Sequence, residues 1–462
     1  MSDAHDGDDL GSLDPLTRRV LEEWLSEGPG LEDPLMNLYE YLKRQLMERD
    51  GFLPSSDPSR RGSLDPVKDG VIREIAEGLR KEKNEFVASF IKEWIDSSDD
   101  PNGIIFETPT QASVCPQVRG DFPSLEKLLA WENDHLSYSQ TDLVEKSIQI
   151  YSKWGFFDRS CLDIPRDKFS CFIRTIAKNY RSENPYHNFH HAHSVLAIAG
   201  NLIRSCCTGI WTDLEEFSIL TAAMCHDVGH RALNSEYYIK TRHQLAIQYN
   251  DISVLENMHC SLTFDLLRSS DFTTAWSDEQ WTTFRKIFIQ CVLATDMKSH
   301  FELTSKLNNE LLKQGSLNPE QKKVIYQSIL HAADLSNPVM PTKACYQWAF
   351  RVVEEMYEQG RLEERDGFCV APFMRHAPTE EIELAKLQVS FVGFIVAPLW
   401  RSLAILWPVL EPRVIQLERN LKFWESLRDQ AIVRLDSAAS DVTRSDSNDH
   451  LLSNHVFRTF SH

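Results

Sequence analysis

The sequence is short of basic residues, of paired cysteines and of long apolar segments, and each shortage excludes a class of protein. Its 462 residues carry 49 Lys and Arg against 68 Asp and Glu, and the net charge of -19 argues against nonspecific nucleic-acid binding. The ten cysteines form no CxxC framework, so we expect reduced thiols in a cytoplasmic protein. Residues 1–6 lack the basic and then apolar order of a signal peptide, and secretion is not expected.

One segment, residues 389–410, is apolar enough to raise the question of a membrane span. Arg401 interrupts it, and Pro398 and Pro408 disturb its helical regularity. We therefore expect a buried helix followed by a turn, and no membrane span.

Helical periodicity dominates the chain and predicts an all-α fold. The content of 42% hydrophobic and 25% charged residues is typical of a protein with a packed core. Three Asp-Pro pairs precede amphipathic stretches and favour helix starts there: Asp14-Pro15, Asp33-Pro34 and Asp65-Pro66. We expect three segments. The first is an N-terminal helical region over 1–110, a candidate regulatory region with a linker near 51–62. A large helical domain over 115–435 and a flexible polar tail over 436–462 follow.

Ser63 is a candidate phosphorylation site within the N-terminal region. Arg60 and Arg61 precede it, as in the sites of basophilic kinases, and a phosphate there would lie just before a predicted helix start. The alternative is a solvated basic loop without a modification.

Histidines recur at intervals of four residues in the middle of the large domain. His187 and His191 form the first pair, and His226 and His230 form the second. Residues four apart lie on one face of a helix, so we expect each pair to share a helical face. A histidine on an apolar helix is often only a core residue, so neither pair alone predicts a ligand.

Two carboxylates accompany these histidines in apolar surroundings. Asp227 follows His226 directly, and Asp334 follows two alanines. A buried carboxylate is costly unless it is paired or binds a metal. Two imidazoles and two carboxylates suit zinc, manganese or iron, and a carboxylate can bridge to a second ion such as magnesium. The order of these residues is typical of HD-type phosphohydrolases.

The region from about residue 154 to 429 closely resembles the catalytic domain of the class I cyclic nucleotide phosphodiesterases. The resemblance rests on strings that occur in the same order as in that family: Tyr186-His187-Asn188 with His191, His226-Asp227-Val228 with His230, Tyr249-Asn250-Asp251, Ser253-Val254-Leu255-Glu256-Asn257, Ala294-Thr295-Asp296-Met297, Ala333-Asp334-Leu335-Ser336-Asn337-Pro338, and Gln388-Val389 with Phe391.

The resemblance implies a compact multi-helix domain and a metal-dependent hydrolysis of 3',5'-cyclic nucleotides to 5'-monophosphates. A hydroxide shared by two ions would attack the phosphorus, and His187 would donate a proton to the leaving oxygen. The carboxylate that must keep His187 protonated cannot be identified from the sequence. The implied ligands of the tighter ion, zinc, are His191, His226, Asp227 and Asp334, and Asp227 also faces a magnesium or manganese ion.

The resemblance also implies roles around these residues. His230, Glu256 and Asp296 would orient water on the second ion, although each could instead make ordinary core hydrogen bonds. Gln388 would bind the purine, and Phe391 and Val352 would enclose it; the remaining substrate-side candidates are Asn337 and Tyr186. Asn337 favours cAMP, while cGMP or dual specificity stays open.

The sequence departs from the family pattern at several positions. These are Ser194, Gly229, Arg231-Ala232, Met258 and Cys345, none of which is an implied ligand. Two alternatives therefore remain: another HD-type nucleotide phosphohydrolase, or a cyclic-nucleotide sensor with a weakened metal site. Besides the small-molecule nucleotide, candidate partners are a kinase at Ser63 and a second copy of the chain in a homodimer.

Overall fold

The structure is a computed structural model that describes residues 123–310 and 317–456, with side chains over 123–308 and 317–434. The predicted N-terminal region, its linker and Ser63 lie outside the described residues. The described residues form helices and no strand, which confirms the predicted all-α class. The rest of this section follows the helices that place the site.

The first four long helices are α6 (Gln140–Trp154), α7 (Arg166–Lys178), α8 (Phe189–Cys206) and α9 (Asp213–Cys225). Three of them, α6, α8 and α9, begin at residues whose side chains cap the helix. Ser139 forms a capping box with Asp142 at the start of α6, and Thr212 forms one with Glu215 at the start of α9. Gly155, with φ of 89°, ends α6 in the left-handed conformation that glycine adopts without strain.

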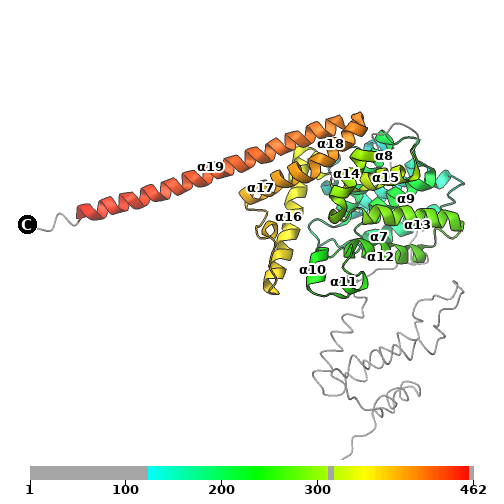
Figure 1. Cartoon of the computed structure of the whole chain (residues 1–462), viewed down its shortest axis with the longest axis horizontal. Coiled ribbons are helices and arrows are strands. Elements are labelled where there is room, and N and C mark those ends of the chain that lie inside the picture. Colours follow the sequence, from blue (N-terminus) through cyan, green and yellow to red (C-terminus); the bar gives the residue numbers. More distant parts are fainter. Residues whose placement is uncertain (1–122, 311–316, 457–462) are drawn as a thin grey trace, which may run out of the picture. The chain divides into compact units, whose positions relative to one another are not determined.

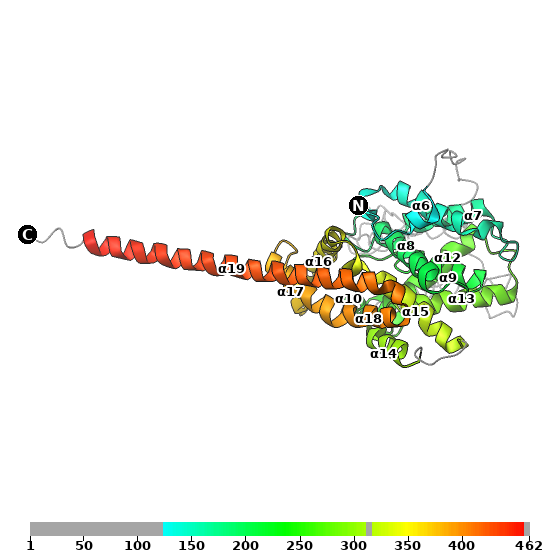
Figure 2. The same cartoon turned by 90° about the horizontal axis from the view of Figure 1, so that it is seen from above.

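The remaining long helices complete the domain, as Figures 1 and 2 show from two directions. They are α12 (Val254–Ser270), α13 (Asp278–Leu293), α14 (His300–Glu310), α15 (Pro319–Asp334), α16 (Thr342–Arg365), α17 (Glu381–Phe391), α18 (Ala397–Leu406) and α19 (Glu411–Val456). Short helices connect them: α5 (Leu125–Leu128), η3 (His135–Ser137), η4 (Phe156–Asp158), α10 (Ser235–Lys240), α11 (Gln244–Gln248), η5 (Met297–Ser299), η6 (Asn337–Val339), η7 (Pro372–Met374), the π-helix η8 (Val392–Val396) and η9 (Pro408–Leu410).

Buried aromatic rings fill the space between α6, α7, α9 and the loop after α12. Phe169 packs edge-on against Tyr151 at 4.7 Å between ring centroids and against Phe272 at 5.0 Å. Phe217 of α9 lies 5.2 Å from the same ring. Each such pair stabilises the fold by about 0.5–1.5 kcal/mol beyond its buried area. This cluster fixes α9 against its neighbours, and α9 leads directly into the predicted metal ligands.

The apolar segment predicted as a buried helix and a turn is a longer and less buried helix than expected. It runs continuously over Glu381–Leu406, and 44% of its most apolar window is buried. By length and composition alone it could cross a membrane, a test that core helices also pass. Pro398 does not break it, because the residue lies in the first turn of α18 just after the π-helix.

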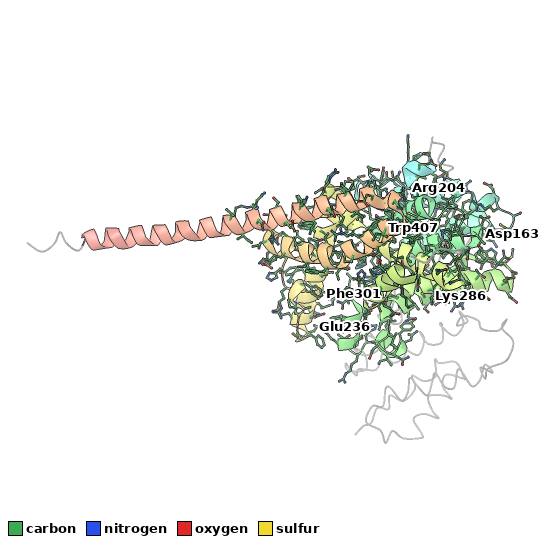
Figure 3. The ribbon with its side chains drawn as sticks, turned by 45° about the horizontal axis from the view of Figure 1, so that its top comes forward. Asp163, Arg204, Glu236, Lys286, Phe301 and Trp407 are labelled. Carbon is green, nitrogen blue, oxygen red and sulfur yellow. The ribbon has the colours of Figure 1, made fainter. Side chains whose placement is uncertain are left out.

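Neighbouring helices cover part of this segment, and other parts face outward. α17 and α18 pack against α19, as Figure 2 shows, and Arg401 forms an ion pair with Glu418 of α19 at 3.3 Å. Phe394 is 76% exposed, and Phe301 of α14, labelled in Figure 3, is 67% exposed.

The C-terminal helix extends past the predicted start of the tail. α19 continues to Val456, so the boundary that composition predicts at residue 436 falls within a helix. The flexibility of residues 436–462 stays a prediction.

Candidate active site

Four side chains, from two helices and from the turn that follows a third, meet at one point. Ligand atoms of His191, His226, Asp227 and Asp334 all lie within 4.8 Å of one another. The Nε2 atom of His191 is 3.0 Å from Oδ1 of Asp334, and that of His226 is 3.0 Å from Oδ2 of Asp227. α8 carries His191, Asp334 is the last residue of α15, and the other two follow α9. The structure thus assembles the set that the sequence predicted as metal ligands.

The chemistry of this group fits a divalent cation. Nδ1 of His226 donates to the carbonyl of Ala223 at 2.9 Å, so the other ring nitrogen, Nε2, faces the group. The Nε2 atoms of His191 and His226 lie 3.2 Å apart, close enough for both to bind one cation in their unprotonated forms. Burial would raise the pKa of Asp227 and Asp334, but the adjacent His226 imidazole outweighs it and lowers both pKa values, which favours the ionised ligands.

His187 belongs to a second group, together with His230 and Glu355. Nδ1 of His187 contacts Oε1 of Glu355, and the backbone N–H groups of Tyr186 and His187 both donate to Oε2 at 3.0 Å. Burial disfavours the imidazolium, but the Glu355 carboxylate outweighs burial and raises the pKa of His187 to about 9. At neutral pH His187 therefore holds the proton that a general acid needs.

Glu355 is the carboxylate that could not be identified from the sequence. It is 5% exposed on α16, and attraction to His187 outweighs burial and lowers its pKa to about 2. The sequence does contain a pattern that points to this carboxylate. Trp348, Val352 and Glu355 follow the spacing of one helical face, and an acid on an otherwise apolar face needs a buried partner.

His230 lies against His187 as a neutral ring. The two rings stack at 3.9 Å with an interplanar angle of 24°. Burial and then the charge of His187 lower the pKa of His230 to about 3. Its Nδ1 accepts from the N–H of Ala232, and the Asn184 amide donates to the carbonyls of both histidines at 2.8 Å. Asn184 therefore fixes the spacing of the pair.

The prediction that each histidine pair shares a helical face is wrong. α8 begins at Phe189, so His187 precedes both the helix and its capping residue Asn188. α9 ends at Cys225, and His226 and His230 lie on either side of a turn in which Gly229 has φ of 80°. The side chains converge because helix ends, rather than one helix face, bring them to the site.

Glu256 and Asp296 lie on the Asp227 side of the site. Burial and then repulsion from Asp296 raise the pKa of Glu256 to about 7, and its Oε2 has no hydrogen-bond partner among the described residues. Oδ2 of Asp296 accepts from Ser253 at 2.8 Å. His259 was not predicted: its Nδ1 donates to the Val228 carbonyl at 2.7 Å, and its Nε2 lies 3.6 Å from Oδ1 of Asp227.

On the substrate side, Asn337 contacts Tyr186, which in turn packs against His191, one of the four predicted metal ligands. The Asn337 amide donates to the Tyr186 hydroxyl at 2.7 Å, and the Tyr186 ring lies 4.6 Å from that of His191. Gln388 is buried on α17, with Phe391 half-buried one turn later. Val352 lies on α16, which packs against α17. No contact found in the described part of the chain links these last three residues to the metal group, so their substrate roles stay predictions.

Two departures from the family pattern are neighbours in space. A Cβ added at Gly229 would meet Leu262 at 2.6 Å and the sulfur of Met258 at 3.6 Å. Glycine at position 229 therefore leaves room for Leu262, and Met258 lies within ordinary contact distance. Ser194 is buried, and its hydroxyl has no partner among the described residues. Cys345 is buried in α16, and burial raises its pKa to about 12.

Comparison with known proteins places this site in a family. The family model described as 3'5'-cyclic nucleotide phosphodiesterase matches residues 186–417, which include both histidine groups. A 3',5'-cyclic-nucleotide phosphodiesterase of Dictyostelium discoideum, regA, is 30% identical over 67% of this chain and 39% of its own length. A probable 3',5'-cyclic-AMP phosphodiesterase of Caenorhabditis elegans is 35% identical over 57% of this chain and 40% of its own length.

A solved structure has the same fold. The phosphodiesterase domain of the RhoPDE fusion protein from the choanoflagellate Salpingoeca rosetta is 30% identical, with a TM-score of 0.63. The match covers 66% of this chain and 99% of that domain. This chain spans about two fifths of the length of the curated relatives above, so the similarity concerns one domain of those proteins.

Proposed function

The chain belongs to the 3'5'-cyclic nucleotide phosphodiesterase family, and from this membership we propose that it hydrolyses 3',5'-cyclic nucleotides, cAMP in preference to cGMP, to 5'-monophosphates. The observation that supports the proposal most directly is the pair of groups at the site. One is a set of four side chains that could hold a divalent cation, and the other is a histidine whose pKa a buried carboxylate raises. The preference for cAMP is supported by the names of several relatives and by the position of Asn337 beside Tyr186.

His191, His226, Asp227 and Asp334 would hold the tighter ion, for which we propose zinc. Asp227 would also face a magnesium or manganese ion, on the side where His259, Glu256 and Asp296 lie. Bound ions supply Lewis acidity, which polarises phosphoryl oxygens and activates water.

The chain's own residues handle the proton. His187 donates it to the 3' oxygen as the ring opens, because an alkoxide is a poor leaving group without one. Glu355 holds the His187 ring and stabilises its charge, while His230 packs against its face. Asn184 keeps the two histidines at one spacing.

A turnover assay tests this function against its two alternatives. The purified chain would be incubated with cAMP, cGMP or ATP, with and without a chelator, and 5'-monophosphate would be measured. The proposal expects chelator-sensitive release of AMP from cAMP, with a higher kcat/KM than for cGMP. Hydrolysis of ATP alone would instead indicate another HD-type phosphohydrolase. Binding of cAMP without turnover, in protein shown to contain metal, would indicate a sensor.

A further inference from the structure

A cavity lies between the start of the described chain, α6 and α8, and shares no lining residue with His191, His226, Asp227 and Asp334. Its volume is about 310 Å³. α8 turns His191 toward the metal ligands and His193, two residues later, toward this cavity. The lining side chains include Lys127, Asn133, His135, Tyr138, Lys146 and His193.

The cavity is cationic, although the chain as a whole is acidic. Lys127 and Lys146 line it, and no Asp or Glu is among the described residues of its wall. The described contacts give neither lysine an ion-pair partner, and Nζ of Lys146 lies 4.2 Å above the Tyr138 ring. Two acids outside the wall act on its residues but also have other partners: Asp134, near His135, pairs with Lys343 at 3.6 Å, and Asp142, near Lys146, caps α6. The charge around the cavity therefore favours an anion.

One buried imidazole in the wall offers a nitrogen with no partner. His135 is 3% exposed, and its Nδ1 makes no hydrogen bond to any described residue. A buried polar nitrogen left unpaired costs about 1–3 kcal/mol in general, so such groups usually have a partner that is a water, an ion or a ligand. A neutral His135 ring carries one N–H, which no described residue accepts, so the ring is a candidate donor for an anion.

The other imidazole, His193, offers an acceptor. The hydroxyl of Ser147 has one proton, which it donates to the Leu143 carbonyl at 2.8 Å. Since Nδ1 of His193 lies 2.8 Å from the same oxygen, the ring must donate there, and its Nε2 keeps a lone pair. No hydrogen bond from the described residues uses that lone pair. The wall thus combines positive charge with both a donor and an acceptor.

We propose that this cavity binds a phosphate group that still carries a proton, either hydrogen phosphate or a singly protonated phosphomonoester. Lys127 and Lys146 balance the charge, the ring N–H of His135 donates to one oxygen, and the P–OH group donates to Nε2 of His193. Sulfate has a similar size but no proton to donate at neutral pH, so this arrangement discriminates against it. The site is independent of the hydrolysis proposed above.

Inorganic phosphate and sulfate are the probes for a test on the full chain. Ring ¹⁵N signals of His135 and His193 would be followed while each anion is added, in the wild type, in Lys146→Gln and in the control Lys153→Gln, which removes the same charge from an exposed position of α6. We expect phosphate to shift both signals. The phosphate concentration at half-saturation should rise at least about tenfold in Lys146→Gln, which corresponds to about 1.4 kcal/mol of binding free energy, and should not rise in the control.

Phosphate that binds at His191, His226, Asp227 and Asp334 should do so with the same affinity in Lys146→Gln and Lys153→Gln, so a difference between these variants reports on the cavity. Equal half-saturation in the two variants, or no shift of either ring, would overturn the proposal. Sulfate binding as tightly as phosphate would also overturn it. A third titration, with AMP, separates the two sources: stronger shifts with AMP indicate a phosphomonoester, and shifts with phosphate alone indicate the free ion.

Discussion

Glu355 decides the protonation state of His187, and its removal has a defined effect on the pH profile. The folded-state pKa of His187, about 9, lies above the ordinary value of 6.5. The acid form therefore persists through neutral pH and is lost as pH rises through about 9. Without the carboxylate, burial is the largest remaining influence, and it lowers the pKa.

We expect Glu355→Gln to move the alkaline fall in kcat to lower pH and to reduce kcat at pH 8 at least about tenfold, within the range of general-acid contributions. The measurement is kcat between about pH 6 and 10, a range that includes both the ordinary and the folded-state pKa of His187. Glu354→Gln, the adjacent acid, is the matched control and should leave the profile unchanged. An alkaline fall at the same pH in wild type and Glu355→Gln would show that Glu355 does not set the protonation of His187.

Ala232 adopts a conformation that suits glycine. Its φ is 59°, in the left-handed region that costs a residue with a Cβ roughly 1–2 kcal/mol. We expect Ala232→Gly to raise the free energy of unfolding by about 0.5–1 kcal/mol, since part of the gain is offset by the freer unfolded chain. Thermal unfolding measures this. Ala344→Gly, within α16, should shift the stability in the opposite direction.

At the scale of elements, helix ends rather than helix faces build the site. Asp334 ends α15, Asn337 begins η6, and His226 follows α9. The sequence identified these residues because their types and order resemble a family. It could not place them, because the positions of helix ends depend on turns and caps such as Gly229 and Asn188, and period-four spacing alone implied continuous helices.

Asn420 of α19 holds one of these helix ends in place. It is fully buried, its amide donates to the carbonyls of Pro338 and Met340 at 2.8 Å, and its oxygen accepts from Thr342 at 2.7 Å. These bonds enclose η6, which carries Asn337. The C-terminal helix therefore supports the substrate side of the site.

We expect Asn420→Ala to lower the free energy of unfolding by about 2–4 kcal/mol, because two buried carbonyls lose their donors. Since Asn337 lies within the released segment, KM for cAMP should rise more than kcat falls. Urea unfolding and steady-state kinetics measure the two effects. Gln416→Ala removes a neighbouring amide that donates to Asn420, and a smaller loss is expected there. A stable variant with unchanged KM would contradict the assignment.

At the scale of the whole molecule, sequence reasoning identified the class of fold and the set of converging ligands. The tertiary pairings were beyond its reach. Glu355 lies 168 residues from His187 along the chain, and His259 faces Asp227 from a different helix. Such pairs leave no local pattern, because burial and partner choice are decided only when the helices pack. The cationic cavity was missed for the same reason, since it forms only where His193 of α8 packs beside residues 123–146.

A cation bound by His191, His226, Asp227 and Asp334 would tie α8, the end of α9 and α15 together, so its removal should affect stability as well as turnover. A ligand that binds only the folded state stabilises it by RT ln(1 + [L]/Kd), about 4 kcal/mol at a thousandfold excess over Kd. We expect a chelator to abolish hydrolysis and to lower Tm by several degrees, and readdition of the ion to restore both. Asp334→Ala should lack bound metal and activity, and a chelator should not lower its Tm further. An Asp334→Ala protein that keeps its metal, or a wild type whose Tm is unchanged on chelation while metal analysis shows the ion has left, would mean that these four side chains do not share a cation.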